Sequence, residues 1–293
     1  MKKRFLSGSS GPLFSFIMIS YTNLIMAWFK DAEHFKSVCG YEINGGWYPR
    51  VTQILSIKAK PALEFFLKEV GSYAAADEIK TKSAEEGTLV HETIQKLAVG
   101  EEIAIPKEVQ PAAAAFVEFQ KKNQIFFHPE YVESRIWSNL HRYAGTVDAL
   151  ATIGGKFGVL DIKTSTGFYP EYNLQTAAYV LALQELDLKR ALKLPGEIAT
   201  RWILRVDQQR QCLRCGASLR EKGGRNKVRQ AKSGNGTEHC GSSHEDHYWG
   251  PVEGIVEMRE SPYYFKDIKA FLAAKTLWEW ENDYWLKQVG YLR

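Results

Sequence analysis

Two carboxylates and a lysine on neighbouring segments of the chain have residue types and a spacing that could do chemistry. Asp148 lies in one extended segment, and Asp161 and Lys163 end the next one, beyond a Gly-Gly turn. Because residues i and i+2 of a strand point to the same face, we expect Asp161 and Lys163 to share a face while Ile162 points into the core. A hairpin at the two glycines can place Asp148 beside them.

This set of groups is suited to a divalent cation. Two carboxylates and the main-chain carbonyl of Ile162 offer the oxygen ligands that Mg²⁺, or Mn²⁺, prefers. A lysine beside such an ion can orient an attacking water molecule. A surface salt bridge is the alternative, because Asp-x-Lys triplets are common. The apolar residues 158–160 before Asp161 favour the metal, since a charge that ends a buried strand needs a partner or an ion.

Four motifs occur in a fixed order over residues 47–185. They are Gly87-Thr88-Leu89-Val90-His91-Glu92, Gly145-x-x-Asp148, Asp161-Ile162-Lys163 and Gln175-Thr176-Ala177-Ala178-Tyr179. Together they resemble the RecB-type exonuclease branch of the PD-(D/E)XK nuclease superfamily. One departure is that Asp148 follows Val147 and not the proline of the superfamily's name, which leaves the resemblance intact.

The resemblance implies a role for each matched residue. Asp148, Asp161 and the Ile162 carbonyl would bind Mg²⁺, and Lys163 would act on the water. His91 would be a further metal ligand or a residue that supports one; a core or surface histidine is the alternative. Gln175 and Tyr179 lie one helical turn apart and would contact nucleic acid or support the catalytic strand. For Tyr179, a plain core residue is the alternative.

The activity that the resemblance implies is Mg²⁺-dependent hydrolysis of DNA. We expect an exonuclease that acts on single-stranded or frayed DNA ends in repair, recombination or phage-type processing, with an endonuclease as a variant of the same chemistry. A non-catalytic zinc-containing DNA-binding protein on the same fold is the alternative. Glu133, on an expected strand, could add a carboxylate to the site, but charged strand residues are more often solvated.

A second group of ligand-type residues lies further along the chain. Cys212 and Cys215 form a Cys-x-x-Cys pair followed by a glycine, and Cys240 follows 25 residues later. Zinc in structural sites takes four tetrahedral nitrogen or sulfur ligands. We expect a zinc-ribbon-like site made by the three cysteines and one histidine, with the candidates in the order His244, His247, His239. A redox Cys-x-x-Cys is the alternative, but it lacks a thioredoxin-like context.

The segment around these cysteines is also basic. Residues 210–232 contain eight Lys and Arg side chains and one acid, Glu221. Phosphate contact is the natural use of such a segment, and a solubilising loop is the alternative. The residues that we expect to contact nucleic acid here are Arg220, Lys222, Arg225, Lys227 and Arg229.

Periodicity predicts the elements that must position these groups. We expect helices at residues 61–70, 83–99, 111–124, 170–184 and 264–284, and strands at 130–138, 144–153, 157–162, 199–206 and 251–259. The order favours an α/β fold with a mixed central β-sheet flanked by helices, a restriction-endonuclease-like core with a small zinc-ribbon insert between two late strands. The expected division is an N-terminal extension at 1–40, the core at 41–206, the basic zinc-binding insert at 207–250 and a strand and helix at 251–293 that complete the core.

Composition excludes several classes of protein. Of 293 residues, 45% are hydrophobic and 25% charged, which excludes collagen-like, disordered and membrane-bundle chains. The net charge of +4 permits a DNA partner without requiring one. Four cysteines are too few for a disulfide framework and favour a reducing compartment. Polar residues break the apolar run at 12–29, so we expect a cytoplasmic protein with no membrane partner; a secretory signal is the alternative.

Overall fold

A central mixed β-sheet organises the protein. The computed structural model describes residues 29–58, 61–231, 240 and 244–292. Within this part, the sheet has the order β10-β9-β8-β7-β6-β3, and β11 also pairs with β8. Strands β7 and β8 are parallel, and the other neighbours are antiparallel. The strands are β3 (Phe126–Phe127), β6 (Ala149–Ile153), β7 (Lys156–Lys163), β8 (Thr200–Cys212), β9 (Ser218–Lys222), β10 (Arg225–Arg229) and β11 (Trp249–Glu260).

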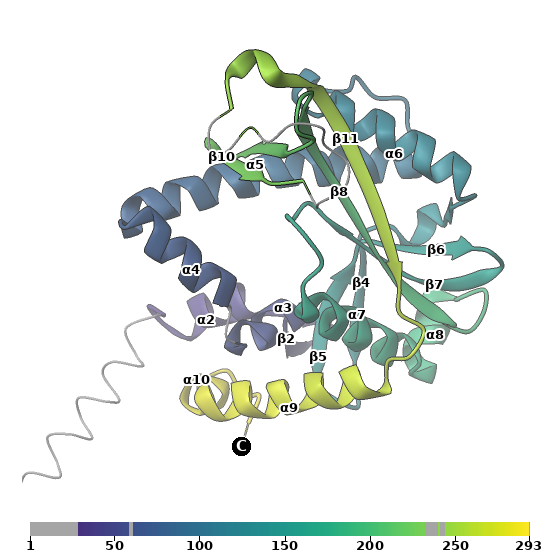
Figure 1. The fold of residues 1–293 in the computed structure, drawn as a ribbon. Helices are drawn as coiled ribbons and strands as arrows, with labels where there is room; N and C mark the ends of the chain where they lie inside the picture. Colours follow the sequence, from purple (N-terminus) through teal and green to yellow (C-terminus); the bar gives the residue numbers. More distant parts are fainter. Residues whose placement is uncertain (1–28, 59–60, 232–239, 241–243, 293) are drawn as a thin grey trace, which may run out of the picture.

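Helices cover both faces of this sheet (Figure 1). One layer contains α5 (Tyr73–Ala98) and α6 (Gln110–Lys122), and the opposite layer contains α7 (Pro170–Leu183) and α9 (Phe265–Glu281). The remaining elements are α2 (Ala32–Cys39), β1 (Gly40–Ile43), β2 (Gly46–Pro49), α3 (Val51–Ile54), α4 (Pro61–Val70), β4 (Ser134–Ser138), β5 (Tyr143–Val147), α8 (Leu186–Leu192) and α10 (Asp283–Gln288). The expected α/β class with a mixed sheet flanked by helices is confirmed.

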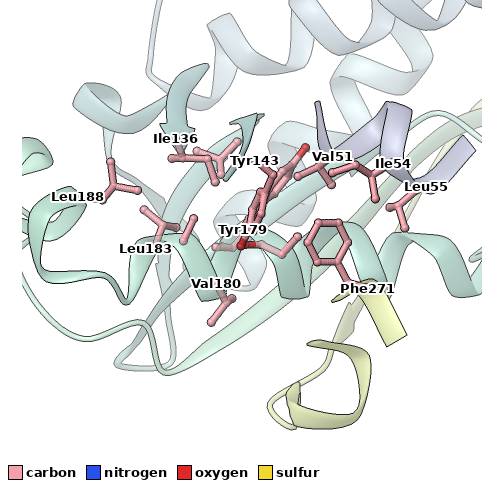
Figure 2. Packing of buried hydrophobic residues seen from close by; sticks show 14 of the residues in the cluster. Val51, Ile54, Leu55, Ile136, Tyr143, Tyr179, Val180, Leu183, Leu188 and Phe271 are labelled. Atoms are coloured by element: carbon pink, nitrogen blue, oxygen red, sulfur yellow. The ribbon is translucent and has the colours of Figure 1, made fainter. Parts of the chain in front are cut away.

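Strand β7 separates two hydrophobic cores. Val159 packs into the core with α7 and α9, whereas Leu160 and Ile162 pack into the core with α5 and α6. Figure 2 shows part of the first core, in which Tyr179 and Val180 of α7 lie near Phe271 of α9. Because side chains alternate along a strand, the polar residues Asp161 and Lys163 lie on the α7 side of β7.

The chain breaks the strand expected at 144–153. β5 pairs with β4 and β6 pairs with β7, and Asp148 lies between them. The strand divides there because Asp148 makes hydrogen bonds outside the regular strand pairing. Its carboxylate accepts the main-chain N–H of Ile162, and its carbonyl accepts that of Glu133. Asp148 therefore lies at the junction of β5 and β6, with its carboxylate directed toward β7.

Two other element predictions need correction. The helix expected at 83–99 begins ten residues earlier as α5, because the Ser72 hydroxyl caps it by accepting the N–H of Ala75. The strand expected at 130–138 is reduced to β4, since residues 129–131 form a short 3₁₀ turn.

The expected domain boundaries are also corrected. Phe35 and Cys39 of α2 are buried in the core with α9, so the folded chain begins before the expected boundary at residue 40. Boundaries at 206 and 250 fall within or beside one continuous pair of strands, because β8 and β11 pair from Trp202 with Glu260 as far as Cys212 with Trp249. The insert is therefore residues 213–248. The apolar run expected at 12–29 lies, up to residue 28, outside the described residues, and no described helix has the length and apolarity needed to cross a membrane.

Candidate functional site

Strands β6 and β7 bring the predicted carboxylates and lysine together. The main-chain N–H of Ile162 donates a hydrogen bond to Asp148 Oδ2 at 2.6 Å, so Asp148 lies beside β7 as the hairpin predicts. Lys163 Nζ lies 2.7 Å from Asp161 Oδ2. The Asp161 side chain is fully buried, and the contact is ionic, because Oδ2 has no partner in hydrogen-bonding geometry. The Lys163 ammonium therefore already neutralises this carboxylate, and among the described residues the group whose ligand atoms lie close enough to share an ion is His91, Glu133 and Asp148, without Asp161.

Helix α5 adds a histidine to this cluster. His91 Nε2 lies 3.1 Å from Asp148 Oδ2. Gln95, one turn further along the same helix face, donates a hydrogen bond to Glu133 Oε1. Single ligand atoms of His91, Glu133 and Asp148 lie within 4.8 Å of one another. The structure therefore places the Glu133 carboxylate near the site, although the residue is exposed and lies just before β4, so its charge is solvated as expected.

Gln95 is a site residue that the sequence analysis does not identify, and the conformation of Glu133 is a feature that it cannot show. Gln95 stands at i+4 from His91 and so shares its helix face. Glu133 has a φ of 52°, a left-handed conformation that is unusual outside glycine and that strand periodicity does not reveal. Asn44, Gln124, Arg142 and Lys193 have similar positive φ values, so this conformation does not by itself mark the site.

Burial and mutual charge shift the pKa values of the cluster. Burial raises the pKa of Asp161 to about 6, with the nearby charge of Asp148 raising it and Lys163 opposing the change. Burial would also raise the pKa of Asp148. The hydrogen bond from His91 and the charge of Lys163 outweigh this effect, so the pKa of Asp148 is lowered. Burial would lower the pKa values of Lys163 and His91. Their carboxylate partners outweigh this effect, so both pKa values are raised above the ordinary ones. Two neighbouring carboxylates with pKa values shifted in opposite directions are typical of a functional site, and a bound cation would stabilise the charged form of both.

Helix α7 supports the cluster from the core side. Gln175 Nε2 donates to Asp161 Oδ1 at 3.2 Å and to the Tyr179 hydroxyl at 2.8 Å. Tyr179 is only 2% exposed and packs in the core of Figure 2. This burial corrects the expectation that Tyr179 contacts nucleic acid and agrees with the alternative of a supporting role. Gln175 is half-buried and holds the orientation of the Asp161 carboxylate.

Gly145 of β5 leaves room for the Tyr179 ring. A Cβ atom at this position would lie 2.5 Å from Tyr179 Cε1. We expect Gly145→Ala to lower the free energy of unfolding by about 1–3 kcal/mol, because overpacking displaces a buried ring. Urea unfolding measures this change. In Gly145→Ala/Tyr179→Leu the two losses should be less than additive. A Gly145→Ala protein that unfolds at the wild-type urea concentration would contradict the packing.

An open cleft lies beside the cluster. It has a volume of about 560 Å³, and its lining includes His91, Gln95, Glu133 and Thr164, together with Gly87 of α5. At Gly87 a Cβ atom would approach Thr164 Oγ1 to 2.8 Å, so glycine allows α5 to pass close to the end of β7. The cleft gives a ligand access to the histidine and carboxylate side of the cluster.

The insert holds the second predicted group of ligands. Cys212, Cys215, Cys240 and His244 place one ligand atom each within 4.8 Å of one another. Cys212 Sγ lies 3.9 Å from Cys240 Sγ, and Cys215 Sγ lies 3.2 Å from His244 Nε2. Tetrahedral zinc with bonds of about 2.3 Å to sulfur and about 2.0 Å to nitrogen requires ligand atoms about 3.5–3.8 Å apart. The donor set and these distances are compatible with zinc.

The surroundings of the cysteines favour a bound cation. Burial would raise the pKa of Cys212, but the main-chain N–H groups of Cys215 and Arg214 outweigh it and the pKa is lowered. Burial and the two neighbouring thiols raise the pKa of Cys240 to about 11. Three sulfurs in contact can all be thiolates only when a cation lies between them. The His244 ring, 4.7 Å from the Trp249 ring, is held by stacking.

Of the other two candidate histidines, only His247 is described, and it does not join this group. The His247 side chain is 67% exposed and lies 3.3 Å from Glu245. His239 lies outside the described residues. The preference for His244 as the fourth ligand is therefore supported by the described geometry.

Strands β9 and β10 carry the five predicted phosphate-binding cations. Arg225 stands opposite Lys222 in the register, and Lys227 opposite Arg220. Directly opposed side chains share a face, and like charges there are destabilising unless acceptors pair with them. Lys227 and Arg229 are exposed.

Three of these cations already have partners. Arg220 pairs with Asp207, Arg225 pairs with Glu69, and Lys222 Nζ donates to the Thr164 carbonyl at 2.7 Å. Burial and the charge of Arg220 lower the pKa of Lys222 to about 8. Arg220, Lys222 and Arg225 thus have partners within the protein, and the contact of the five cations with nucleic acid stays a prediction.

Comparisons with known proteins give no family for this chain. No protein-family model matches it, and no curated protein has significant sequence similarity to it. The geometry of the two groups of residues is therefore the main indication of this chain's function.

Proposed function

We propose that this protein is a Mg²⁺-dependent deoxyribonuclease of the PD-(D/E)XK superfamily, in its RecB-type branch. The observation that carries the proposal is the meeting of residues from three distant segments. His91 of α5, Asp148, Asp161 and Lys163 of the β6–β7 hairpin, and Gln175 of α7 form one connected set of contacts. A surface salt bridge would not need a fully buried aspartate supported by a glutamine from another layer.

In this proposal each group of residues at the site has its own role. Asp148, Asp161 and the carbonyl of Ile162 would hold the cation, which when bound lowers the pKa of its water and stabilises charge on the attacked phosphate. His91 fixes the orientation of the Asp148 carboxylate through its hydrogen bond. The Lys163 ammonium, 18% exposed, can donate a hydrogen bond to the attacking water and stabilise the charge that develops on the phosphate.

The basic insert favours DNA as the substrate. Lys227 and Arg229 are exposed on the hairpin whose other cations, Arg220 and Lys222, reach the residue that follows Lys163. A phosphate backbone lying along this face would lead toward the cleft. Because such contacts release counterions, binding should weaken steeply with salt. We assign the insert as a zinc ribbon and the sheet with its flanking helices as a restriction-endonuclease-like core.

Digestion of labelled DNA tests the proposal. Purified protein is incubated with end-labelled single-stranded and duplex linear DNA and with a closed circle, in Mg²⁺, Mn²⁺ or EDTA. We expect metal-dependent loss of linear DNA, strongest on single-stranded or frayed ends, and intact circles. Cleavage of circles would make the enzyme an endonuclease with the same chemistry. Salt-sensitive binding without cleavage in any metal would reject catalysis and support the zinc-containing DNA-binding alternative.

A further inference from the structure

The chain that follows Lys163 is held by cations from other strands. Arg220 Nη2 donates to the Thr164 carbonyl at 3.0 Å, and Lys222 Nζ donates to the same oxygen at 2.7 Å. Arg205 Nη1 donates to the next carbonyl, that of Ser165, at 3.2 Å. Two successive main-chain carbonyls directly after a lysine of the candidate site therefore accept charge-assisted hydrogen bonds, which are stronger than neutral ones.

These cations are themselves fixed. Asp207 Oδ2 accepts from Arg220 Nε at 2.7 Å and from Arg205 Nη1 at 2.9 Å, so one carboxylate joins both arginines. Asp207, like Arg205, is 8% exposed. A buried network with its members paired is rigid, and removal of one member leaves buried groups without partners.

The tip of the β9–β10 hairpin is seated on helix α5. The N–H of Gly223 donates to Glu86 Oε2 at 2.9 Å, and a Cβ atom on Gly223 would lie 2.1 Å from Ser83 Oγ. Gly87, one turn after Ser83, allows the approach of both Thr164 and Lys222. The hairpin thus bridges α5, which carries His91, and the end of β7, which carries Lys163.

The hairpin begins beside the cysteine group. Strand β9 pairs with β8 only at Leu219 with Arg210 and Ser218 with Gln211, next to Cys212. The small core of the insert consists of Cys212, Cys215, Ala217, Leu219 and Trp249, with Cys240 and Tyr248 against it. A core of this size gives little stability without a metal.

From these contacts we propose that Arg220 and Lys222 are positioning residues: the hairpin held by the Cys212–Cys215–Cys240–His244 group clamps the Thr164 carbonyl and thereby fixes Lys163 at the active site. The catalytic part of this proposal rests on the proposed nuclease function, and the mechanical part does not. The clamp assigns Arg220 and Lys222 to the inside of the protein, whereas Lys227 on the same hairpin remains available for phosphate.

Hydrogen exchange of the DNA-free protein tests the mechanical part. In Lys222→Met, which keeps the side-chain length, we expect amides 163–166 to exchange about tenfold faster or more, because a charge-assisted hydrogen bond is lost. Lys227→Met is the matched control and should leave this exchange unchanged. Cys240→Ser should produce the same acceleration as Lys222→Met, and the double variant should add nothing further, because both changes open one clamp.

Steady-state kinetics tests the catalytic part on the same proteins. Lys222→Met should lower kcat with little change in KM, whereas Lys227→Met should raise KM with little change in kcat. Unchanged exchange at 163–166 in Lys222→Met, or in Cys240→Ser, would overturn the clamp. If the wild-type protein cuts no DNA but the exchange effects are present, the nuclease function fails and the clamp stands. If it cuts DNA and the Lys222→Met protein has normal exchange and kcat, the clamp fails alone.

Discussion

Replacement of Lys163 by methionine is expected to lower the rate of DNA cleavage by about a hundredfold to ten-thousandfold, the usual contribution of a positioned proton-transfer or charge-stabilising group. Methionine keeps the length of the side chain and removes the ammonium that lies 2.7 Å from Asp161 Oδ2. Single-turnover digestion of end-labelled single-stranded DNA in Mg²⁺ measures the rate of the chemical step. DNA affinity in the absence of a divalent cation should change little, because one partly buried lysine contributes little to a phosphate-binding surface.

The first residue of the same strand provides the matched control. Lys156 is exposed and pairs with Glu260 at the surface, so Lys156→Met makes the same change of charge away from the cluster. Its cleavage rate should stay within about twofold of wild type, because exposed ion pairs contribute little. Both variants are compared by circular dichroism and thermal melting, since loss of Lys163 leaves the buried Asp161 with a pKa raised further above its value of about 6. Equal rates for the two folded variants would remove Lys163 from the mechanism.

The local part of this site could be predicted from the sequence. Strand parity alone places Asp161 and Lys163 on one face and Ile162 on the other, and the structure has them so. The prediction failed where a side chain replaces a ladder hydrogen bond. At Asp148 the carboxylate accepts the N–H of Ile162, and the strand divides there, which residue periodicity does not register. The unusual φ of Glu133 was hidden for the same reason, because it depends on contacts between segments.

The basic insert shows a second limit of sequence patterns. A count of charges in residues 210–232 indicates an anionic partner but does not show which cations are already paired. Arg220 pairs with Asp207, which lies outside the counted segment, and Lys222 donates a hydrogen bond to the Thr164 carbonyl. Both partners come from segments that only the sheet topology brings near. The spacing of the cysteines, in contrast, was sufficient to predict the cluster, because few arrangements place four ligand atoms around one ion.

Replacement of His244 by alanine is expected to weaken zinc binding by at least about a hundredfold, because even partners outside the ligand set cost roughly ten- to a hundredfold. His244 Nε2 lies 3.2 Å from Cys215 Sγ, and the ring stacks on Trp249, so the side chain is held ready to bind a metal. Competition with a chromophoric chelator measures the affinity, and atomic absorption of the purified protein gives the zinc content. Loss of zinc should also lower the stability of the insert, because metal binding and folding are linked.

The chain offers its own control three residues away. His247 is exposed and lies beside Glu245, so His247→Ala should keep a full equivalent of zinc and the wild-type affinity.

The pair of variants also separates the metal site from a redox Cys-x-x-Cys. A redox pair would not need His244, and its reactivity would follow the thiolate character of Cys212 and Cys215 in both variants alike. Normal zinc content in His244→Ala, or its loss in His247→Ala, would contradict the assigned ligand set. If His244→Ala also speeds exchange at residues 163–166, the cysteine group and the proposed active site are coupled through the β9–β10 hairpin, since none of the four candidate ligands is hydrogen-bonded to Thr164 among the described contacts.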